Sequence, residues 1–382
     1  VPAPGTMREV SELVGLLYAR PLDRARPLWE MWIIEGLENG RVAEFMKTHH
    51  CLTDGQGGTG LSEVMSDLTP DASGPIEIPE ALGEAPPRPP SETQVVTNAW
   101  RHVWDRSRKT LHYLRGAASE AISDRLHRRE AFDPPTPGDV PWVSFNGVVG
   151  SQRAFSFTSI PLDRVKAIKK GLDVTVNDVV LELVGSVVRR YLQTRGELPE
   201  VPLVACLPVS IREAGDQRLG NQITNMAVSL ETDLGHPAER LRRIHRGVVR
   251  AREKLSEGHV DLFGAIGESL APFAAHALME MSSSEATLKR MPLQCNFVVS
   301  NVRGTQAPLY TAGAKIESMY PLSMVQSGQG LNVTVFSYAG RVDFGFTVDP
   351  HLLPDYWELA EGIEPALIEL EEDLERLTRR VR

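Results

Sequence analysis

The chain has 382 residues, of which 42% are hydrophobic and 24% are charged, a composition typical of globular proteins. This length is too great for one ordinary core and predicts two domains, or one large layered domain. The formal net charge of -9 at pH 7 argues against a nucleic-acid partner, because no global positive field would attract phosphates.

The three cysteines, Cys51, Cys206 and Cys295, are widely spaced and odd in number. That pattern describes neither a disulfide framework nor a zinc site, so we expect a reducing, cytoplasmic location. No apolar run approaches the roughly 20 residues needed to span a bilayer. The nearest candidate, Leu262 to Met281, is interrupted by charged residues and a proline, and we interpret it as a soluble or interfacial helix.

The first elements in chain order are a helix and a pair of strands. Leucines at helical spacing predict a helix over Ser11 to Ala19. Strand formers then fill Pro27 to Glu35, the turn residues Glu38 to Gly40 follow, and Arg41 to His49 returns as a second strand. The sequence therefore predicts a β-hairpin that ends at His49.

A cluster of chemically versatile residues follows this hairpin, in the string HHxxxDG. It comprises the adjacent imidazoles His49 and His50, then Asp54 and Gly55. Neutral imidazole is suited to general base catalysis, because its reference pKa lies near 6.5. Successive strand residues point to opposite faces, so the two rings cannot address one reacting atom unless the strand has ended. One histidine is expected to be catalytic and the other supporting.

This stretch allows three other interpretations. Gly55, Gly57 and Gly60 formally satisfy the dinucleotide fingerprint GxGxxG, but a lone match is weak, and we favour small residues that allow close packing. Cys51 beside His50 could act as a nucleophile, although nothing else in the sequence indicates activation. A metal site is disfavoured, because neighbouring ligands cannot all converge on one ion.

A proline-rich segment and an amphipathic helix come next. Pro70 to Pro90 is expected to be a loop that leads out of the first domain. Ser91 to about Arg129 has helical periodicity, with Trp100 and Trp104 on the apolar side and many arginines opposite. Such a helix either bridges two domains or lies on a membrane surface. We expect an N-terminal domain over residues 1–85, a linker over 86–150 and a C-terminal domain over 151–382.

The remaining elements alternate between strands and helices, which predicts an α/β fold with mixed sheets flanked by helices. Strands are expected at Arg153 to Ile160, Val201 to Ile211, Ile223 to Glu231, Gln294 to Ser300, Lys315 to Tyr320, Leu331 to Tyr338 and Arg341 to Val348. Helices are expected at Pro161 to Lys170, Asn177 to Arg195, Pro237 to Leu255, part of Val260 to Ser284 and Pro354 to Thr378.

Five separated motifs occur in an order that resembles one known family. They are RPLDRARPLWE at Arg20 to Glu30, HHxxxDG, VNDVV at Val176 to Val180, SNVRG at Ser300 to Gly304, and GQGLNVT at Gly328 to Thr334. Together they resemble the bacterial wax ester synthase/acyl-CoA:diacylglycerol acyltransferase family of the CoA-dependent acyltransferase superfamily. The resemblance covers almost the whole chain.

The resemblance implies two chloramphenicol-acetyltransferase-like domains with an active-site tunnel at their interface. It also implies an O-acyltransferase that moves a long-chain acyl group from acyl-CoA to diacylglycerol or a long-chain alcohol, giving triacylglycerol or wax ester. Acyl-CoA is then a co-substrate, and neither a further cofactor nor a metal is expected.

The resemblance implies roles for individual residues. His50 is the expected general base and His49 its neighbour in the site. The expected structural supports of the site are Asp54, Gly55, Asn177, Asp178, Pro27, Leu28 and Trp29. Asn301 and Gln329 are candidates for oxyanion or substrate contacts, and the alternative for each is that it ties down a turn.

The chain departs from the family at its beginning. Family members usually open with a further strand and helix ahead of the stretch that matches Val1 to Gly5, so we expect a missing N-terminal segment. Two other functions remain open: condensation of carrier-bound substrates, which shares HHxxxDG, and non-catalytic lipid binding on the same fold. Peripheral contact with a membrane or lipid droplet is a further expectation.

Overall fold

A computed structural model describes residues 1–52, 65–71, 91, 93–98, 101, 104, 130, 132–210, 223–256, 280 and 284–381. Asp54 and Gly55 lie outside these residues, as do Gly57, Gly60 and most of the predicted helix over Ser91 to Arg129. Residues 93–98 form a helix, as expected from the sequence.

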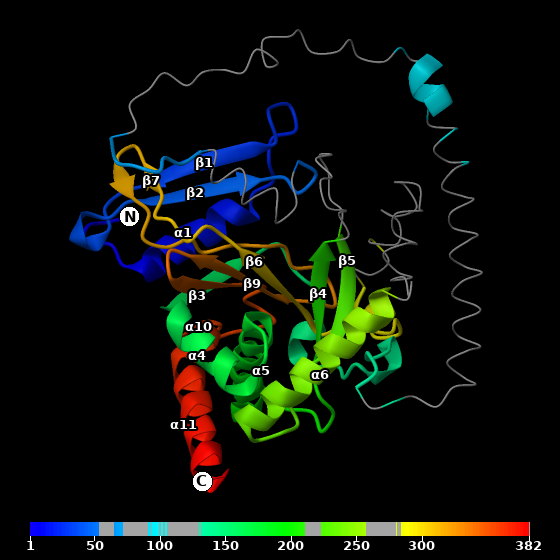
Figure 1. Ribbon diagram of the computed structural model, residues 1–382. Helices are drawn as coiled ribbons and strands as arrows, with labels where there is room; N and C mark the ends of the chain where they lie inside the picture. The colour runs from blue at the N-terminus through cyan, green and yellow to red at the C-terminus, as the bar shows by residue number, and fades with distance from the viewer. Residues whose placement is uncertain are drawn as a thin grey trace.

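A mixed six-stranded sheet forms the centre of the molecule (Figure 1). Its strand order is β3-β10-β9-β6-β4-β5. β6 runs parallel to both of its neighbours, β4 and β9, and the other pairs are antiparallel. The strands are β3 (Ala154–Pro161), β4 (Val204–Ser210), β5 (Ile223–Ser229), β6 (Phe297–Arg303), β9 (Leu331–Tyr338) and β10 (Arg341–Val348). The α/β class with a mixed sheet is confirmed.

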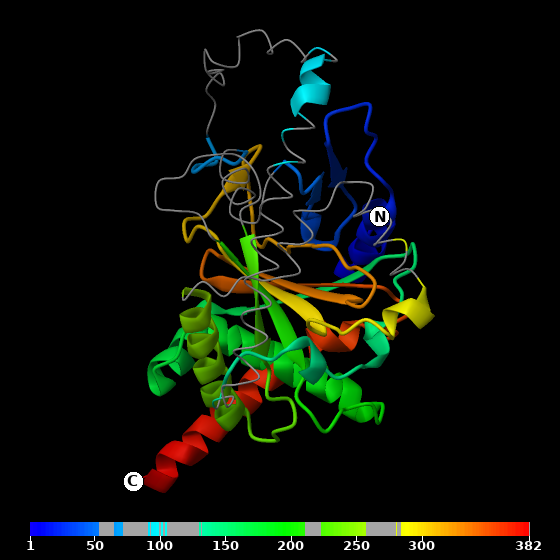
Figure 2. The ribbon, with the colours of Figure 1, turned by 90° about the vertical axis from the view of Figure 1, so that its right-hand side faces the viewer.

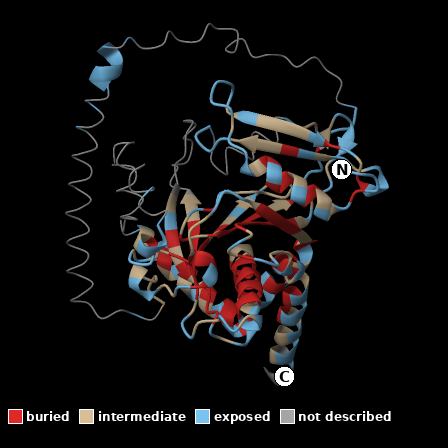
Figure 3. Ribbon diagram, turned by 180° about the vertical axis from the view of Figure 1, so that it is seen from behind, coloured by how far each residue is buried: buried red, intermediate tan, exposed pale blue. Residues whose placement is uncertain are grey.

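Helices cover one face of this sheet and bury the main core (Figures 1 and 3). The central one is α5, which is buried along most of its length. Apolar side chains at alternating positions of β6, β9 and β10 belong to the same core, as expected for the sheet face that the helices cover. The covering helices are α4 (Leu162–Leu172), α5 (Val176–Thr194), α6 (Pro237–Ser256), α10 (Trp357–Glu361) and α11 (Ile363–Val381).

The N-terminal elements lie on the opposite face of the sheet (Figure 2). Helix α1 (Met7–Ala19) is amphipathic and packs between edge strand β3 and a hairpin of β1 (Trp29–Ile34) and β2 (Ala43–Thr48). A second, smaller core joins them, formed by Val10, Val14, Leu17, Ile34, Leu37, Phe45, Phe155 and Phe157. The predicted hairpin is therefore present and rests on the sheet through α1.

Short elements complete the described chain. The turn between β1 and β2 is a 3₁₀ helix, η1 (Glu38–Gly40), in which Asn39 has a φ of 61°. Two further 3₁₀ turns, η3 (Pro137–Asp139) and η4 (Ser144–Asn146), precede β3. The remaining elements are α9 (Glu285–Leu288), β7 (Tyr310–Thr311) and β8 (Ala314–Lys315).

The predicted strand over Lys315 to Tyr320 is wrong. Only Ala314–Lys315 forms a two-residue strand, and the chain then continues without regular structure. Its backbone groups find other partners: the Met319 N–H donates to Asp343 at 2.8 Å, and the Ile316 carbonyl accepts from the Tyr338 hydroxyl at 3.0 Å. Because these bonds satisfy the backbone, no ladder is needed.

The predicted closing helix over Pro354 to Thr378 is two helices, α10 and α11, that meet at Gly362. A side chain at Gly362 would place its Cβ 2.9 Å from the Glu358 carbonyl oxygen and 3.1 Å from Val187 of α5. The close approach to α5 therefore requires glycine at the junction. The leucine periodicity was right for each part, but it does not show the break.

Candidate functional site

The two histidines follow directly on the end of strand β2. The last paired residue, Thr48, lies opposite Trp29, and the His49 N–H then donates to the Leu28 carbonyl oxygen at 2.9 Å. The Leu52 N–H donates to the His49 carbonyl oxygen at 3.0 Å, which closes a tight turn. The alternation of strand side chains has therefore ended at His49 and His50, and both residues are exposed.

The turn distinguishes the two imidazoles. The Cys51 N–H donates to Nδ1 of His49 at 3.2 Å, so a neutral His49 ring carries its proton on Nε2. That ring has no free acceptor nitrogen. No described residue forms a hydrogen bond with the ring of His50. Within the described residues, the turn therefore engages the ring of His49 and not that of His50.

The Pro-Leu-Trp motif is brought beside the histidine turn. The Trp29 N–H donates to the Pro27 carbonyl oxygen at 2.8 Å, and Leu28 supplies the acceptor for His49. Lys47, two residues before His49, donates from Nζ to the Leu17 carbonyl oxygen of α1 at 3.2 Å. Partial burial lowers the pKa of the Lys47 ammonium. These bonds tie the turn to the start of β1 and to the end of α1.

A second group of motif residues gathers at the first turn of α5. Thr175 caps the helix: its side chain accepts the Asp178 N–H at 3.2 Å, and Asp178 in return accepts the Thr175 N–H at 2.8 Å. This is the reciprocal arrangement of a capping box. Asp178 is fully buried, and its Oδ2 also lies 2.7 Å from Nδ1 of His245 on α6.

Asn177 and Asn301 come together, as neighbours in the structure from distant motifs. Nδ2 of Asn301 on β6 donates to Oδ1 of Asn177 at 3.3 Å. Asn301 has the same strand parity as Phe297 and Val299, which are buried against the helices. The asparagine pair therefore lies on the helix-covered face of the sheet, whereas the hairpin that carries the histidines lies over the other face.

Gln329 forms the contacts of a residue that secures a turn. Its Nε2 donates to Sγ of Cys295 at 2.9 Å, and its Oε1 accepts from Gln326 at 3.1 Å. The backbone of Gln329 also donates to the Gln326 carbonyl oxygen at 2.8 Å. These contacts favour the alternative given for Gln329 above, a turn anchor rather than a substrate contact.

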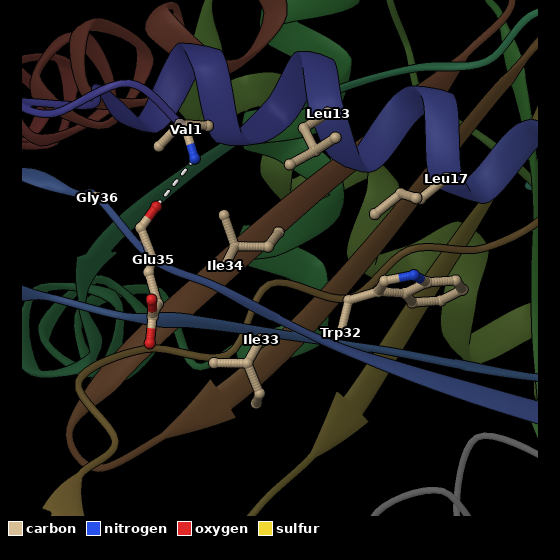
Figure 4. A pocket seen from close by; sticks show the side chains of 8 residues that line it. All are labelled: Val1, Leu13, Leu17, Trp32, Ile33, Ile34, Glu35 and Gly36. Atoms are coloured by element: carbon tan, nitrogen blue, oxygen red, sulfur yellow. Dashed lines mark hydrogen bonds between the residues drawn. The ribbon is translucent and has the colours of Figure 1, made fainter.

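A cavity of about 540 Å³ opens between α1 and β1 (Figure 4). Its wall is mainly aliphatic and aromatic, and the N-terminal amine donates to the Glu35 carbonyl oxygen at 2.9 Å at one end. The lining residues are Val1, Leu13, Leu17, Trp32, Ile33, Ile34, Glu35 and Gly36. None of the candidate site residues that the structure describes lines this cavity.

The described residues contain neither a metal-binding cluster nor a membrane-spanning helix. No group of three or more histidine, cysteine or acidic side chains in them could hold a metal ion. No helix within the described ranges is both long and apolar enough to cross a bilayer. Cys51 is exposed, whereas Cys206 and Cys295 are buried, and none of the three is in a disulfide.

Comparison with known families accounts for most of the chain. Residues 1–180 match the wax ester synthase/diacylglycerol acyltransferase catalytic domain, and residues 219–371 match the C-terminal domain of the same family. The chain belongs to this family. It is therefore an acyltransferase, and the resemblance of its five motifs is confirmed.

Relatives from this family support the assignment along the chain. A putative diacylglycerol O-acyltransferase of Mycobacterium tuberculosis is 34% identical over 381 residues, covering 97% of this chain and 72% of the relative. A second from the same organism is 35% identical, with 97% and 80% covered. A solved wax ester synthase/diacylglycerol acyltransferase from Marinobacter aquaeolei VT8 superimposes with a TM-score of 0.68 at 28% identity, covering 98% of this chain and 78% of that one.

Sequence reasoning missed His245 of this acyltransferase. It lies within the arginine-rich helix α6, where a single histidine has no motif around it. Its contact with Asp178 joins residues 67 positions apart. A clue was present, since residues at helical spacing on either side of His245, such as Leu241 and Val248, are apolar and predict that this part of α6 packs inward.

Proposed function

We propose that this acyltransferase moves a long-chain acyl group from acyl-CoA to the hydroxyl of diacylglycerol or of a long-chain alcohol, with His50 as the general base. Family membership over both domains carries the proposal, and the names of the relatives supply the substrate classes. The turn at His49 and His50 supports the choice of base.

The reaction needs a group that removes the proton of the acceptor hydroxyl, because an alcohol oxygen is a poor nucleophile at neutral pH. His50 accepts this proton as the oxygen attacks the thioester carbonyl carbon. The C–O bond forms, and the carbonyl oxygen becomes an oxyanion. Collapse of that intermediate breaks the C–S bond, and the imidazolium returns the proton to the departing CoA sulfur. The products are an ester and CoA thiol, with no acyl-enzyme.

His49 has a supporting part in this mechanism. Its Nδ1 is occupied by the Cys51 N–H, so the ring is fixed in one orientation at the head of the turn. Its backbone is joined to Leu28, which links the turn to the Pro-Leu-Trp motif. Asp54 and Gly55 are proposed to hold the following loop, and Trp29 to shape the same surface.

The asparagine pair is proposed as a support rather than as the oxyanion donor. The amide of Asn301 is already engaged by Asn177, and the pair lies on the helix-covered face of the sheet. The pair then influences acyl transfer by fixing the positions of β6 and α5. The N-terminal, linker and C-terminal divisions at residues 1–85, 86–150 and 151–382 remain part of the proposal.

A panel of acceptors tests the function directly. The purified chain is incubated with palmitoyl-CoA and either dioleoylglycerol, hexadecanol, a carrier-protein-bound amino acid or no acceptor, and both thiol release and lipid product are measured. The proposal expects ester product with the diacylglycerol, the alcohol or both. Turnover confined to the carrier-bound acceptor would favour condensation chemistry, and co-purified lipid with no transfer would favour a binding protein.

A further inference from the structure

His245 holds a buried carboxylate that is poorly supplied with other partners. Asp178 is fully buried, whereas the His245 side chain is 31% exposed. Oδ2 of Asp178 already accepts the Thr175 N–H, and a carboxylate has no proton to give, so Nδ1 of His245 is the donor across their 2.7 Å contact. The other oxygen, Oδ1, is buried and accepts no hydrogen bond from any described residue.

The carboxylate therefore depends strongly on His245. Without that ring, the described hydrogen bonds to the Asp178 side chain would reduce to the single one from Thr175. A buried charge that loses a charge-assisted or directional partner is costly, and its surroundings shift to supply another. Asp178 stands in the first turn of α5 beside Asn177 and next to the cap Thr175, so a shift that supplies the carboxylate involves this turn.

That turn is the point where three elements meet. Helix α6 contacts it through His245, and strand β6 contacts it through the bond from Asn301 to Asn177. Since Asn177 and Asp178 are adjacent, a rotation of the turn that re-solvates one side chain moves the other. The histidine is thus coupled to the asparagine pair through a single turn of helix.

Docking of α6 on α5 does not itself require this hydrogen bond. Leu241, Ile244 and Val248 of α6 are buried in the main core and supply apolar contact. A second polar link, from Arg240 to Glu182 at 2.8 Å, already joins the two helices deeper in the core. A polar contact at this position is better suited to fixing an orientation than to adding stability.

We infer that His245 is a positioning residue for acyl transfer: its Nδ1–H bond to Asp178 fixes the first turn of α5 and with it the Asn177–Asn301 pair. The inference rests on the proposed function for its kinetic consequence, but its structural part does not depend on it. His245 itself is not expected to contact substrate.

Two substitutions at His245 separate the hydrogen bond from the bulk of the ring. The amide nitrogen of Asn in His245→Asn can occupy nearly the place of Nδ1, whereas His245→Leu keeps volume but removes the donor. His236→Asn is the matched control, because His236 is exposed immediately before the same helix and its side chain has no described partner. Each variant is assayed for kcat, for KM with palmitoyl-CoA and for thermal unfolding.

The expected result is selective loss and rescue. His245→Leu lowers kcat by between about 10-fold and 100-fold with KM for palmitoyl-CoA within twofold, since a small misplacement of the site acts on the chemical step. His245→Asn recovers most of this loss, and His236→Asn matches the parent chain. Wild-type kcat in His245→Leu, or equal losses in the Leu and Asn variants, would overturn the inference.

Two further readouts keep the test decisive. In an Asn177→Ala background, the addition of His245→Leu should lower kcat by less than a further factor of about two. The effects of two coupled residues on kcat are not additive. Amide exchange over Thr175 to Asp178 should accelerate about tenfold in His245→Leu but not in His245→Asn. Unchanged exchange in His245→Leu contradicts the inference even if the chain transfers no acyl group, whereas an inactive parent chain contradicts only the proposed function.

Discussion

The backbone N–H of His49 donates to the carbonyl oxygen of Leu28 at 2.9 Å, one step beyond the last strand pair of the hairpin. Through this bond the Pro-Leu-Trp motif and the histidine turn form one structural unit. Two motifs that are about twenty residues apart in the sequence are therefore a single feature of the fold. Whatever disturbs the hairpin is expected to disturb the site.

Removal of Phe45 tests this dependence. The Phe45 ring is buried in the small core that joins the hairpin to α1, and it stacks on Trp32 of the paired strand at a centroid distance of 5.3 Å. Phe45→Ala is expected to lower the free energy of unfolding by about 3 kcal/mol, because a large buried side chain leaves a cavity. Transfer activity should fall with it, as measured by urea unfolding and thiol release.

Val42→Ala is the control for Phe45→Ala, since Val42 precedes the same strand but is 58% exposed. It should change stability by less than about 0.5 kcal/mol. Normal activity in a Phe45→Ala protein that has lost stability would show that the hairpin does not position the histidines.

Gly345 of β10 marks a point where only glycine fits. A Cβ there would lie 1.9 Å from the Pro321 carbonyl oxygen, in backbone that cannot move aside cheaply. Gly345→Ala should therefore destabilise the fold by at least about 2 kcal/mol. Gly171→Ala near the end of α4 meets nothing within 4 Å and should be neutral or stabilising. Equal melting temperatures for the two variants would contradict the predicted crowding.

Asp343 gives a prediction for pH dependence. Its side chain is buried in β10, where burial raises the pKa of the carboxyl above its ordinary value of 3.8. A raised pKa means that the folded state binds the proton more tightly than the unfolded state. The resulting stabilisation is fully present below the unfolded pKa and is lost as the pH rises through the folded pKa.

Asp343→Asn removes this titration while it can still accept the Met319 N–H. The free energy of unfolding of the parent chain, relative to Asp343→Asn, is expected to decline as the pH rises from about 4 toward 7. Urea unfolding at several pH values across that interval measures it. A difference that is constant or that grows with pH would contradict the assignment.

Periodicity predicted much of the fold because burial follows it closely. The bounds of β9 and β10 agree with the predicted strands at both ends, since Leu331 to Val348 is a run of strand formers with Ala339 and Gly340 as its turn. The break at Gly362 and the irregular path after Lys315 were not predictable. They depend on a close approach to Val187 and on bonds to Asp343 and Tyr338, contacts made between distant parts of the chain.

Some features of the candidate site likewise follow from local sequence, whereas others depend on tertiary contacts. The hairpin, the tight turn and the capping box of Thr175 and Asp178 follow from local residue types. The asparagine pair required both motifs to be known, and His245 required the packing of α6 on α5. Local chemistry can be predicted from sequence, whereas partners supplied by tertiary contact cannot.

The proposed roles of His50 and His49 are tested most directly by replacing each with alanine and measuring CoA thiol release from palmitoyl-CoA in the presence of dioleoylglycerol or hexadecanol. Because a positioned base is lost, His50→Ala is expected to lower kcat by roughly 10²- to 10⁴-fold with its unfolding curve unchanged. His49→Ala is expected to lower kcat less, because Nδ1 of His49 only accepts the Cys51 N–H within the turn. Near-normal turnover by a folded His50→Ala protein would contradict the account.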